Sequence, residues 1–336
     1  RLFLCYTGHI TKGGIIMVSN LIVAVCAIIP LFFLMLIGVA VKKMKLLTEL
    51  ELAHVNRMVF KIFFFFMMFY NIYTTDIAET FRPHLMLFGA LGVLASALIG
   101  GIIICLLEKS NKRRGAMIQA IFRSNFVIMG IPIISNIFGD DQLAIPTMMI
   151  AIIVPIYNIV SVFILETFRG GHFYLPGILL GVLKNPMILG AICGTIFLVL
   201  GIPLPKVILK PVSQLAAATT PMALIILGAS FKAGSYHEHL PQRQAIIVPT
   251  IMLSLAIFVG FRGVELVTLM AIFATPCAVA GYAMAQQMGS DADLAGNCVV
   301  YTTVLSCFTI FGWVFVLKTL GLSDALENIL SYPFRD

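Results

Sequence analysis

The chain has 336 residues, of which 60% are hydrophobic and 11% are charged, and its formal net charge is +7. Soluble globular proteins are about half apolar and about a quarter charged, so this composition is not that of a protein that folds in water. The positive charges lie in short clusters between apolar stretches, without an aromatic and basic face around them. This pattern favours a membrane protein over a nucleic-acid-binding protein.

The N-terminal segment is the first element along the chain. Residues 1–16 precede Met17, which opens an apolar stretch and resembles a natural start, so these residues are expected to be an extension outside the fold. The seven cysteines further along form no CxxC pair and mostly lie within apolar stretches. They are expected to be small core residues, and they predict neither a disulfide framework nor a metal site.

The rest of the chain is a series of apolar stretches. About ten of them reach the roughly twenty residues that a helix needs to cross a bilayer. They are residues 20–41, 58–75, 84–107, 115–138, 143–167, 178–200, 207–231, 243–261, 264–287 and 295–319. None alternates as the strands of a membrane β-barrel do, so the predicted fold class is an all-α integral membrane protein.

Loop charges predict the orientation of these spans. The loops after every second span are the richer in Lys and Arg. Their basic residues are Lys42, Lys43, Lys45, Lys109, Lys112, Arg113, Arg114, Arg169, Lys184, Lys232 and Arg243. The protein is expected to lie in a cell membrane, with these loops on the cytoplasmic side. With an even number of spans, both termini would then lie outside the cytoplasm.

Prolines and glycines recur at corresponding positions in spans that are five apart along the chain. Pro30 and Gly38, eight residues apart in the first span, match Pro186 and Gly194 in the sixth. The fourth and ninth spans each carry an internal proline, and each is followed by a turn with a glycine and acidic residues. Agreement in order and position indicates an internal repeat, although each match alone is weak.

The repeat divides the chain into two halves of five spans. Residues 17–170 and 171–322 are the predicted halves, and residues 323–336 are a C-terminal tail. Halves with an odd number of spans must cross the membrane in opposite directions. An inverted repeat with an interrupted span at matching positions is typical of alternating-access transporters.

The prolines of the fourth and ninth spans predict breaks in those helices. Pro132 has no amide proton and would clash with the carbonyl four residues earlier, so the helix is expected to open there, and Pro276 is expected to act in the same way. Freed backbone groups in hydrocarbon need partners inside the protein, which favours a shared site where the two breaks meet. Half-helix N-termini carry partial positive charge and suit an anion. A kink that only shapes packing is the alternative.

Polar side chains beside the breaks complete the predicted site. Asn125 lies about two turns before Pro132 and offers both donors and an acceptor to a carboxylate. The predicted substrate-binding residues are Ser124, Asn125, Ile131, Pro132, Thr275, Pro276 and Tyr282. Four further residues are accessory candidates; the alternative for Arg123 is a place at the membrane interface, and the alternative for Gln286 is the solvated end of a span. They are Arg123, Lys61, Asp76 and Gln286.

No cofactor or metal ion and no catalytic residue is expected. No ionisable residue lies clearly in the centre of a span, which argues against a dedicated carboxylate relay for protons. Coupling to Na⁺ stays open, because carbonyls of opened helices can bind Na⁺, and coupling to H⁺ is the other choice. His237, Glu238 and His239 lie in a loop with the wrong spacing for a helical metal site, so an enzyme is disfavoured.

Four stretches of the sequence resemble the auxin efflux carrier family. They are SNFVIMGIPII, NPMILGAICG, LAAATTPMALIILGASF and ATPCAVAGYAMAQQMGSDADLA. The family includes plant PIN carriers and bacterial carriers assigned to dicarboxylates such as malate and malonate, and the resemblance covers Met17 to about Leu320. The segment Arg169–Gly177 is short where some plant members carry a long loop. The chain therefore looks like a bacterial-type member.

The resemblance implies ten spans in two inverted five-span repeats, as in bile-acid/sodium symporters. It implies that the fourth and ninth spans break and cross at prolines, which Pro132 and Pro276 match. It also implies that Asn125 contacts the substrate carboxylate. Lys61 and Asp76 are only candidates for the supporting charges of plant carriers.

The sequence thus predicts a secondary transporter of a small organic anion, a dicarboxylate or an auxin-like carboxylate, with an elevator or rocking motion around the crossing. The alternatives are a membrane ligand sensor that binds without transport, and a sodium-coupled carrier of another organic solute. The expected partners are the lipid bilayer and the small organic anion, not nucleic acid. The sequence leaves the oligomeric state open, and a homodimer is one assembly that it allows.

Overall fold

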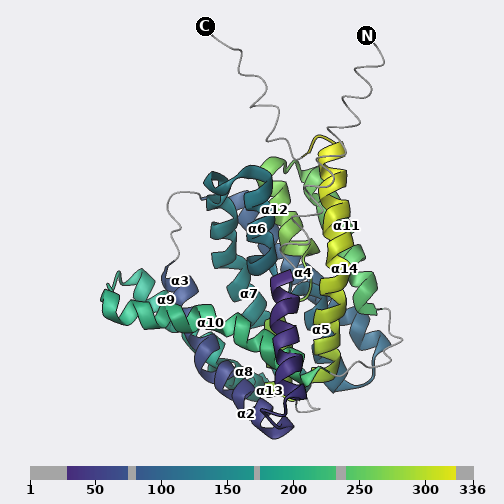
Figure 1. Ribbon diagram of the computed structural model, residues 1–336. Helices are drawn as coiled ribbons and strands as arrows, with labels where there is room; N and C mark the ends of the chain where they lie inside the picture. Colours follow the sequence, from purple (N-terminus) through teal and green to yellow (C-terminus); the bar gives the residue numbers. More distant parts are fainter. Residues whose placement is uncertain (1–28, 75–80, 170–174, 232–239, 323–336) are drawn as a thin grey trace, which may run out of the picture.

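The computed structural model describes residues 29–74, 81–169, 175–231 and 240–322. Regular structure in these ranges is helical, and no strand forms there apart from one isolated antiparallel bridge between Ser124 and Cys277. The predicted all-α fold class is therefore confirmed for this part of the chain (Figure 1). Several predictions fall outside the described residues, namely those for residues 1–16, Asp76, the His237–His239 loop and residues 323–336.

The described helices lie along the predicted apolar stretches, but the stretches 115–138, 178–200 and 264–287 are each divided between separate helices. Up to Arg169 they are a helix at residues 29–43, α2 (Glu49–Met58), the π-helix η1 (Val59–Phe63), α3 (Phe64–Tyr73), α4 (Pro83–Leu107), α5 (Asn111–Phe122), the π-helix η2 (Phe126–Gly130), α6 (Ile131–Phe138), the short η3 (Asp140–Gln142) and α7 (Ala144–Arg169). From Leu175 they are α8 (Leu175–Leu183), α9 (Pro186–Val199), α10 (Lys206–Ser230), α11 (Leu240–Val259), α12 (Gly263–Ala274), α13 (Val279–Gln287) and α14 (Ala292–Thr319).

Local sequence accounts for several of these boundaries. Thr48 and Glu51 cap each other's backbone amides at the start of α2. The Asn185 side chain accepts a hydrogen bond from the Met187 amide at 3.0 Å, and Pro186 occupies the first turn of α9. An Asn cap followed by proline starts a new helix, so α8 and α9 meet at a bend of 61° instead of forming one rod.

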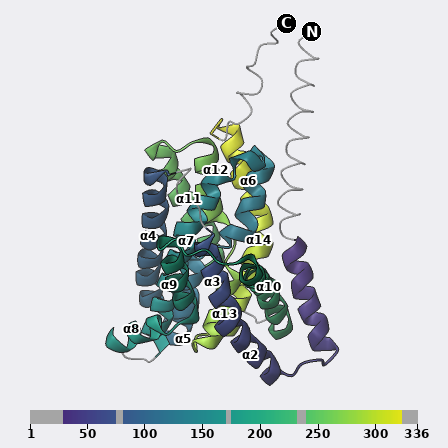
Figure 2. The same cartoon turned by 90° about the vertical axis from the view of Figure 1, so that its left-hand side faces the viewer.

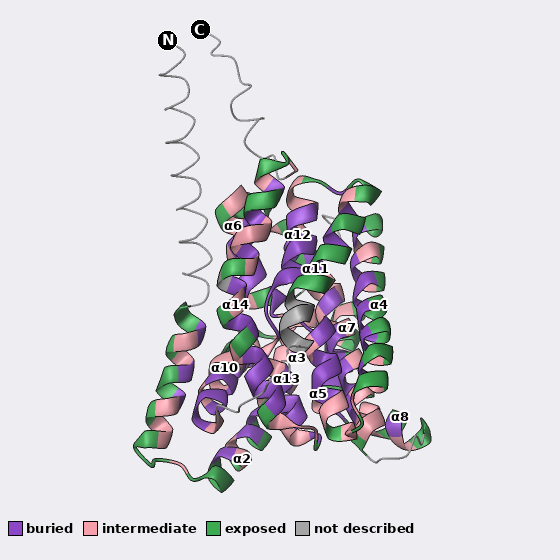
Figure 3. Ribbon diagram, turned by 90° about the vertical axis from the view of Figure 1, so that its right-hand side faces the viewer, coloured by how far each residue is buried: buried purple, intermediate pink, exposed green. Residues whose placement is uncertain are grey.

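Lipid is the expected solvent for much of the outer surface. Among the described residues, four helices are long and apolar enough to cross a membrane, and the number rises to six if each of two bent helix pairs is one span. The four are Glu49–Tyr73, Pro83–Leu107, Ala144–Arg169 and Lys206–Ser230. Much of α4 is exposed along its length (Figure 3), and its exposed residues include Leu91, Leu98 and Leu106. An apolar outer face of this kind fits a bilayer.

The ninth predicted span is broken at its proline, as the sequence predicted. α12 ends at Ala274 and α13 begins at Val279. Thr275 and Ala278 have extended backbone conformations, and Pro276 lies between them. Proline cannot continue the hydrogen-bond pattern of a helix, so the break at this residue follows from its chemistry.

The fourth predicted span is also broken, but not at Pro132. α5 ends at Phe122, the backbone leaves the helical conformation at Arg123, and helix resumes at Phe126 and runs on through Pro132. The prediction that the helix opens at Pro132 is therefore wrong. This proline cannot donate to the preceding turn, and that turn is the wider π-helix η2, so the helix absorbs Pro132 without ending.

Glycines allow two close helix packings. A Cβ atom at Gly228 would lie 2.0 Å from the carbonyl oxygen of Met35, and one at Gly190 would lie 2.3 Å from that of Phe65. The helix at residues 29–43 thus packs against α10, and α9 packs against α3 (Figure 2). We call these helices, with α2, the first group. α4–α7 and α11–α14 pack on one another and form the second group (Figure 1).

Candidate functional site

The two helix breaks are bonded to each other through their backbones. The Asn125 amide donates to the Pro276 carbonyl at 2.7 Å, and the Ala278 amide donates to the Arg123 carbonyl at 3.1 Å. The Cys277 amide donates to the hydroxyl of Thr302, on α14, at 3.0 Å. These three amides of the breaks therefore have partners inside the protein, as an apolar surrounding requires. We call residues 123–125 and 275–278 together the crossing.

Tyr157, on α7, joins the two breaks from the side. Its hydroxyl donates to the Ile272 carbonyl near the end of α12 at 3.0 Å, and it also lies 3.0 Å from the Ser124 hydroxyl. A phenol has one proton, and that proton goes to Ile272, so Ser124 is the donor to Tyr157. Ser124, part of the predicted site, thus holds the crossing together besides facing the cavity described next.

A cavity of about 100 Å³ lies at the crossing, between the two groups of helices. Seven polar residues line it: Asn71, Arg123, Ser124, Asn125, Tyr157, Asn158 and Thr220. The rest of the wall is apolar and includes Phe64 and Met67 of α3 and Val279 of α13. We call this space the crossing cavity.

Asn125 presents an unused donor at this cavity. Its side chain is 7% exposed, and its Nδ2 atom has no hydrogen-bond partner among the described residues. A buried amide without a partner costs about 1–3 kcal/mol. A carboxylate or carbonyl oxygen in the cavity would accept from this group.

Arg123 brings a positive charge to the same place. Its side chain is 5% exposed, and its guanidinium donates to Asn158 Oδ1 at 2.6 Å and to the Met284 sulfur at 2.7 Å. No Asp or Glu in the described part of the chain forms an ion pair with it. Both partners are neutral, and a thioether is a weak acceptor. A buried charge with such partners is poorly compensated until an anion arrives.

The remaining predicted residues lie around the crossing at different distances from this cavity. Thr275 and Pro276 line a smaller cavity of about 20 Å³, on the side of Thr302 and Ser306. Tyr282 lines a third, of about 10 Å³, beside Gln119. Neither Ile131 nor Pro132 belongs to the lining of these three cavities, because both lie beyond η2.

Two accessory candidates lie away from the crossing cavity. Lys61 is exposed on η1. Gln286 accepts a hydrogen bond from the buried Asn56 side chain and so connects α13 to α2 across the two groups of helices. This contact gives Gln286 a structural partner instead of a solvated position.

Sequence reasoning missed four polar residues of the crossing cavity. They are Asn71, Tyr157, Asn158 and Thr220. The available signal was an uncharged polar pair, Tyr157 and Asn158, in the middle of an otherwise apolar span. Both side chains reach the crossing because of how α7 packs, and the apolar stretches of the sequence do not predict that packing.

Comparison with known proteins agrees with this architecture. Residues 23–314 match the family described as "Membrane transport protein". An uncharacterized transporter of Methanocaldococcus jannaschii is 24% identical over 264 residues, which cover 74% of this chain and 82% of that protein. The family match spans most of the chain, including both breaks and every described helix from α2 to α13. The chain therefore belongs to the membrane transport protein family, the auxin efflux carrier family that its sequence resembles, and is a multi-pass membrane transporter.

Proposed function

We propose that this protein is a secondary transporter that moves a small organic anion, a dicarboxylate or an auxin-like carboxylate, by alternating access at the crossing. The observation that carries the proposal is the buried Arg123 guanidinium, which lines the crossing cavity without a carboxylate partner among the described residues. A carboxylate would give the guanidinium a partner of opposite charge, and hydrogen bonds between two charged groups are stronger than those to neutral acceptors. The free Nδ2 of Asn125 supplies a second donor.

The backbone of the crossing also favours an anion. The helical segments that begin at Phe126 and at Val279 both start at the crossing, and Val279 itself lines the cavity. Helix N-termini carry partial positive charge and unpaired amide donors. These dipoles add to the charge of Arg123, so we expect a positive electrostatic potential at the cavity.

The position of the cavity supports alternating access. Phe64, Met67 and Asn71 belong to the first group of helices, whereas Arg123, Asn125 and the other crossing residues belong to the second. Each group has its own internal bonds: close glycine packing in the first, and backbone pairing of the breaks in the second. A sliding or rocking motion of one group against the other would open the cavity to either side of the membrane.

The paired glycine contacts support an inverted repeat of residues 17–170 and 171–322. In the proposed repeat, the helix at 29–43 corresponds to α9, and the rod Glu49–Tyr73 corresponds to α10. Two contacts are equivalent under this correspondence. The helix at 29–43 packs on α10 through Gly38 and Gly228, and α9 packs on α3 through Gly190 and Gly194. An internal symmetry axis in the membrane plane would produce such a pair.

Counterflow in sealed proteoliposomes tests the proposal. Vesicles loaded with an unlabelled carboxylate are expected to accumulate the same labelled compound, and vesicles without protein are not. A panel should contain monocarboxylates, dicarboxylates and their uncharged amides, each with and without a Na⁺ gradient and a pH gradient. Transport of the amides but of none of the acids would contradict the anion assignment, and saturable binding without flux would favour the ligand sensor.

A further inference from the structure

We propose that an apolar groove between α4 and α11 binds one anionic phospholipid, with an acyl chain in the groove and the phosphate at the α4–α5 turn. The groove encloses about 310 Å³ and is lined by residues of α4, α5 and α11. It is separate from the crossing cavity, since it shares no lining residue with that cavity. The inference therefore does not rest on the proposed transport function.

The groove wall is apolar and open to the outside. Ile99 and Ile103 of α4 are 57% and 44% exposed, and Ile247 and Ile251 of α11 are 50% and 60% exposed. Ser96 is the hydroxyl-bearing residue of the lining, and it donates to the Gly92 carbonyl at 2.7 Å. The lining therefore offers hydrocarbon to a ligand, and in a membrane the molecule that covers hydrocarbon from the outside is a lipid chain.

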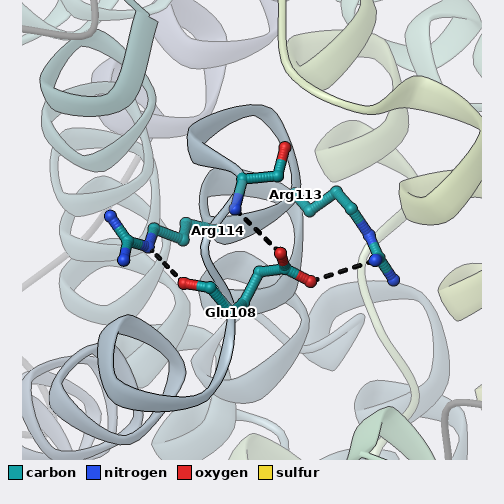
Figure 4. Close-up of polar contacts among 4 residues, drawn as sticks. Glu108, Arg113 and Arg114 are labelled. Atoms are coloured by element: carbon teal, nitrogen blue, oxygen red, sulfur yellow. Dashed lines mark hydrogen bonds and ion pairs between the residues drawn. The ribbon is translucent and has the colours of Figure 1, made fainter.

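The turn after α4 is a rigid, positively charged element close to one end of the groove. Ile103 lies about 6 Å before the end of α4 at Leu107, at 1.5 Å per residue, and Lys109 is the second residue after that end. Figure 4 shows how Glu108 organises this turn: its carboxylate accepts from Arg113 at 3.0 Å and from the Ser110 amide at 2.8 Å. Arg114 donates to the Glu108 carbonyl at 2.6 Å (Figure 4). These contacts fix the turn and use both arginines inside the protein.

Lys109 and Lys112 remain exposed on this fixed turn. The Lys112 carbonyl accepts from the Asp291 amide at 3.0 Å and from the Ser290 hydroxyl at 2.6 Å, so the backbone under the lysines is also tied to the turn between α13 and α14. A lipid phosphate lies where the acyl chain leaves the hydrocarbon. Along α4, the apolar groove for the acyl chain is thus followed by the turn with the two lysines for the phosphate. Two lysines favour a headgroup with a net negative charge.

Native mass spectrometry of the full chain in detergent, with equal amounts of phosphatidylglycerol and phosphatidylcholine, tests the headgroup. The wild-type protein is expected to retain one phosphatidylglycerol in preference to phosphatidylcholine. The double variant Lys109→Gln and Lys112→Gln is expected to lower that preference about tenfold. Lys206→Gln with Lys210→Gln removes two exposed lysines in the first turns of α10 and should leave the preference unchanged.

The groove is tested by filling it from the lipid side. Ala95 is exposed and lines the groove, whereas Leu98, on the same helix, is 67% exposed and does not. Ala95→Trp is expected to lose the retained lipid, and Leu98→Trp is expected to keep it. Retention of equal amounts of both lipids by the wild-type chain, or loss of lipid in neither tryptophan variant, would overturn the proposal. So would a dimer that Ala95→Trp converts to a monomer, because a second copy would then cover the groove.

Fluorescence quenching of the purified protein in vesicles gives a second measurement, which does not depend on a lipid being retained in detergent. The chain has one tryptophan, Trp313, so Ile251→Trp in a Trp313→Phe background places a single reporter in the groove. Brominated phosphatidylglycerol should quench this reporter more strongly than brominated phosphatidylcholine. The same pair of lipids should quench a reporter at Leu98 equally, and equal quenching at position 251 would contradict the proposal.

Discussion

At the scale of single residues, Asn125 and Asn158 show how two buried amides at one cavity differ. Asn158 is used on both sides of its amide: it accepts from Arg123 and donates to the Met68 sulfur at 2.9 Å. Asn125 leaves its Nδ2 without a partner among the described residues. The Asn158 amide therefore holds the structure, and the Nδ2 of Asn125 is free for a ligand.

This difference makes a paired prediction. Asn125→Ala should raise the half-saturation concentration for a carboxylate about tenfold, because a hydrogen bond to a charged group contributes about 1.5–3 kcal/mol, and it should not lower the thermal midpoint, because the removed amide had no partner for its Nδ2 atom. Asn158→Ala should lower the midpoint, because it deprives the buried Arg123 guanidinium of its oxygen partner. Uptake kinetics and thermal unfolding in detergent measure both. A stability loss from Asn125→Ala as large as that from Asn158→Ala would contradict the assignment.

At the scale of secondary-structure elements, the crossing is maintained by side chains outside it. Tyr157 is 3% exposed and bonds the end of α12. Tyr157→Phe would leave the Ile272 carbonyl without this partner and should destabilise the protein by about 1–3 kcal/mol. Chemical denaturation in detergent measures the change. Tyr301→Phe, at a tyrosine that is 39% exposed on α14, is the matched control and should change stability little. Equal effects of the two changes would argue against a special role of Tyr157.

Packing between elements gives a second matched pair. A Cβ at Gly228 would meet the backbone of Met35, whereas one at Gly312, on α14, would meet nothing within 4 Å. Gly228→Ala should therefore force α10 away from the helix at 29–43 and lower the thermal midpoint. Gly312→Ala should be neutral or stabilise by up to about 1 kcal/mol, since alanine is the better helix former. A neutral Gly228→Ala would show that the two helices do not pack this closely.

The elements also show what the sequence could and could not predict. The apolar stretches gave the all-α class and most helix positions, and Pro276 marked the second break because proline itself forbids a continuous helix. Residues 123–125 include no helix-breaking residue, and their break is held by bonds to Pro276 and Tyr157 from distant parts of the chain. Span patterns carry no information about such contacts, so the first break was assigned to the nearby Pro132. For the same reason Tyr157 and Asn158 were not recognised, whereas Ser124 and Asn125 were.

At the scale of the whole molecule, transport requires motion of the first group of helices against the second. Asn56 of α2 and Gln286 of α13 form a hydrogen bond between the two groups. Cross-linking Asn56→Cys to Gln286→Cys with a short thiol-specific reagent should abolish counterflow while leaving carboxylate binding detectable. A link within the second group is the control. A Cβ at Gly115 would lie 3.8 Å from the Ser290 Cβ, a distance that suits a disulfide, so Gly115→Cys with Ser290→Cys should form one and keep transport. Full counterflow in the first cross-linked variant would contradict relative motion of the groups.

Removing the positive charge of Arg123 is the most direct test of anion transport at the crossing. The measurement is counterflow of a carboxylate relative to its carboxamide analogue, in vesicles that contain wild-type protein, Arg123→Gln or the control Lys210→Gln. We expect the wild-type protein and Lys210→Gln to prefer the carboxylate, and Arg123→Gln to lose that preference by about tenfold or more, as the removal of a charge-assisted hydrogen bond implies. An Arg123→Gln protein that keeps the wild-type preference for the carboxylate would contradict the account.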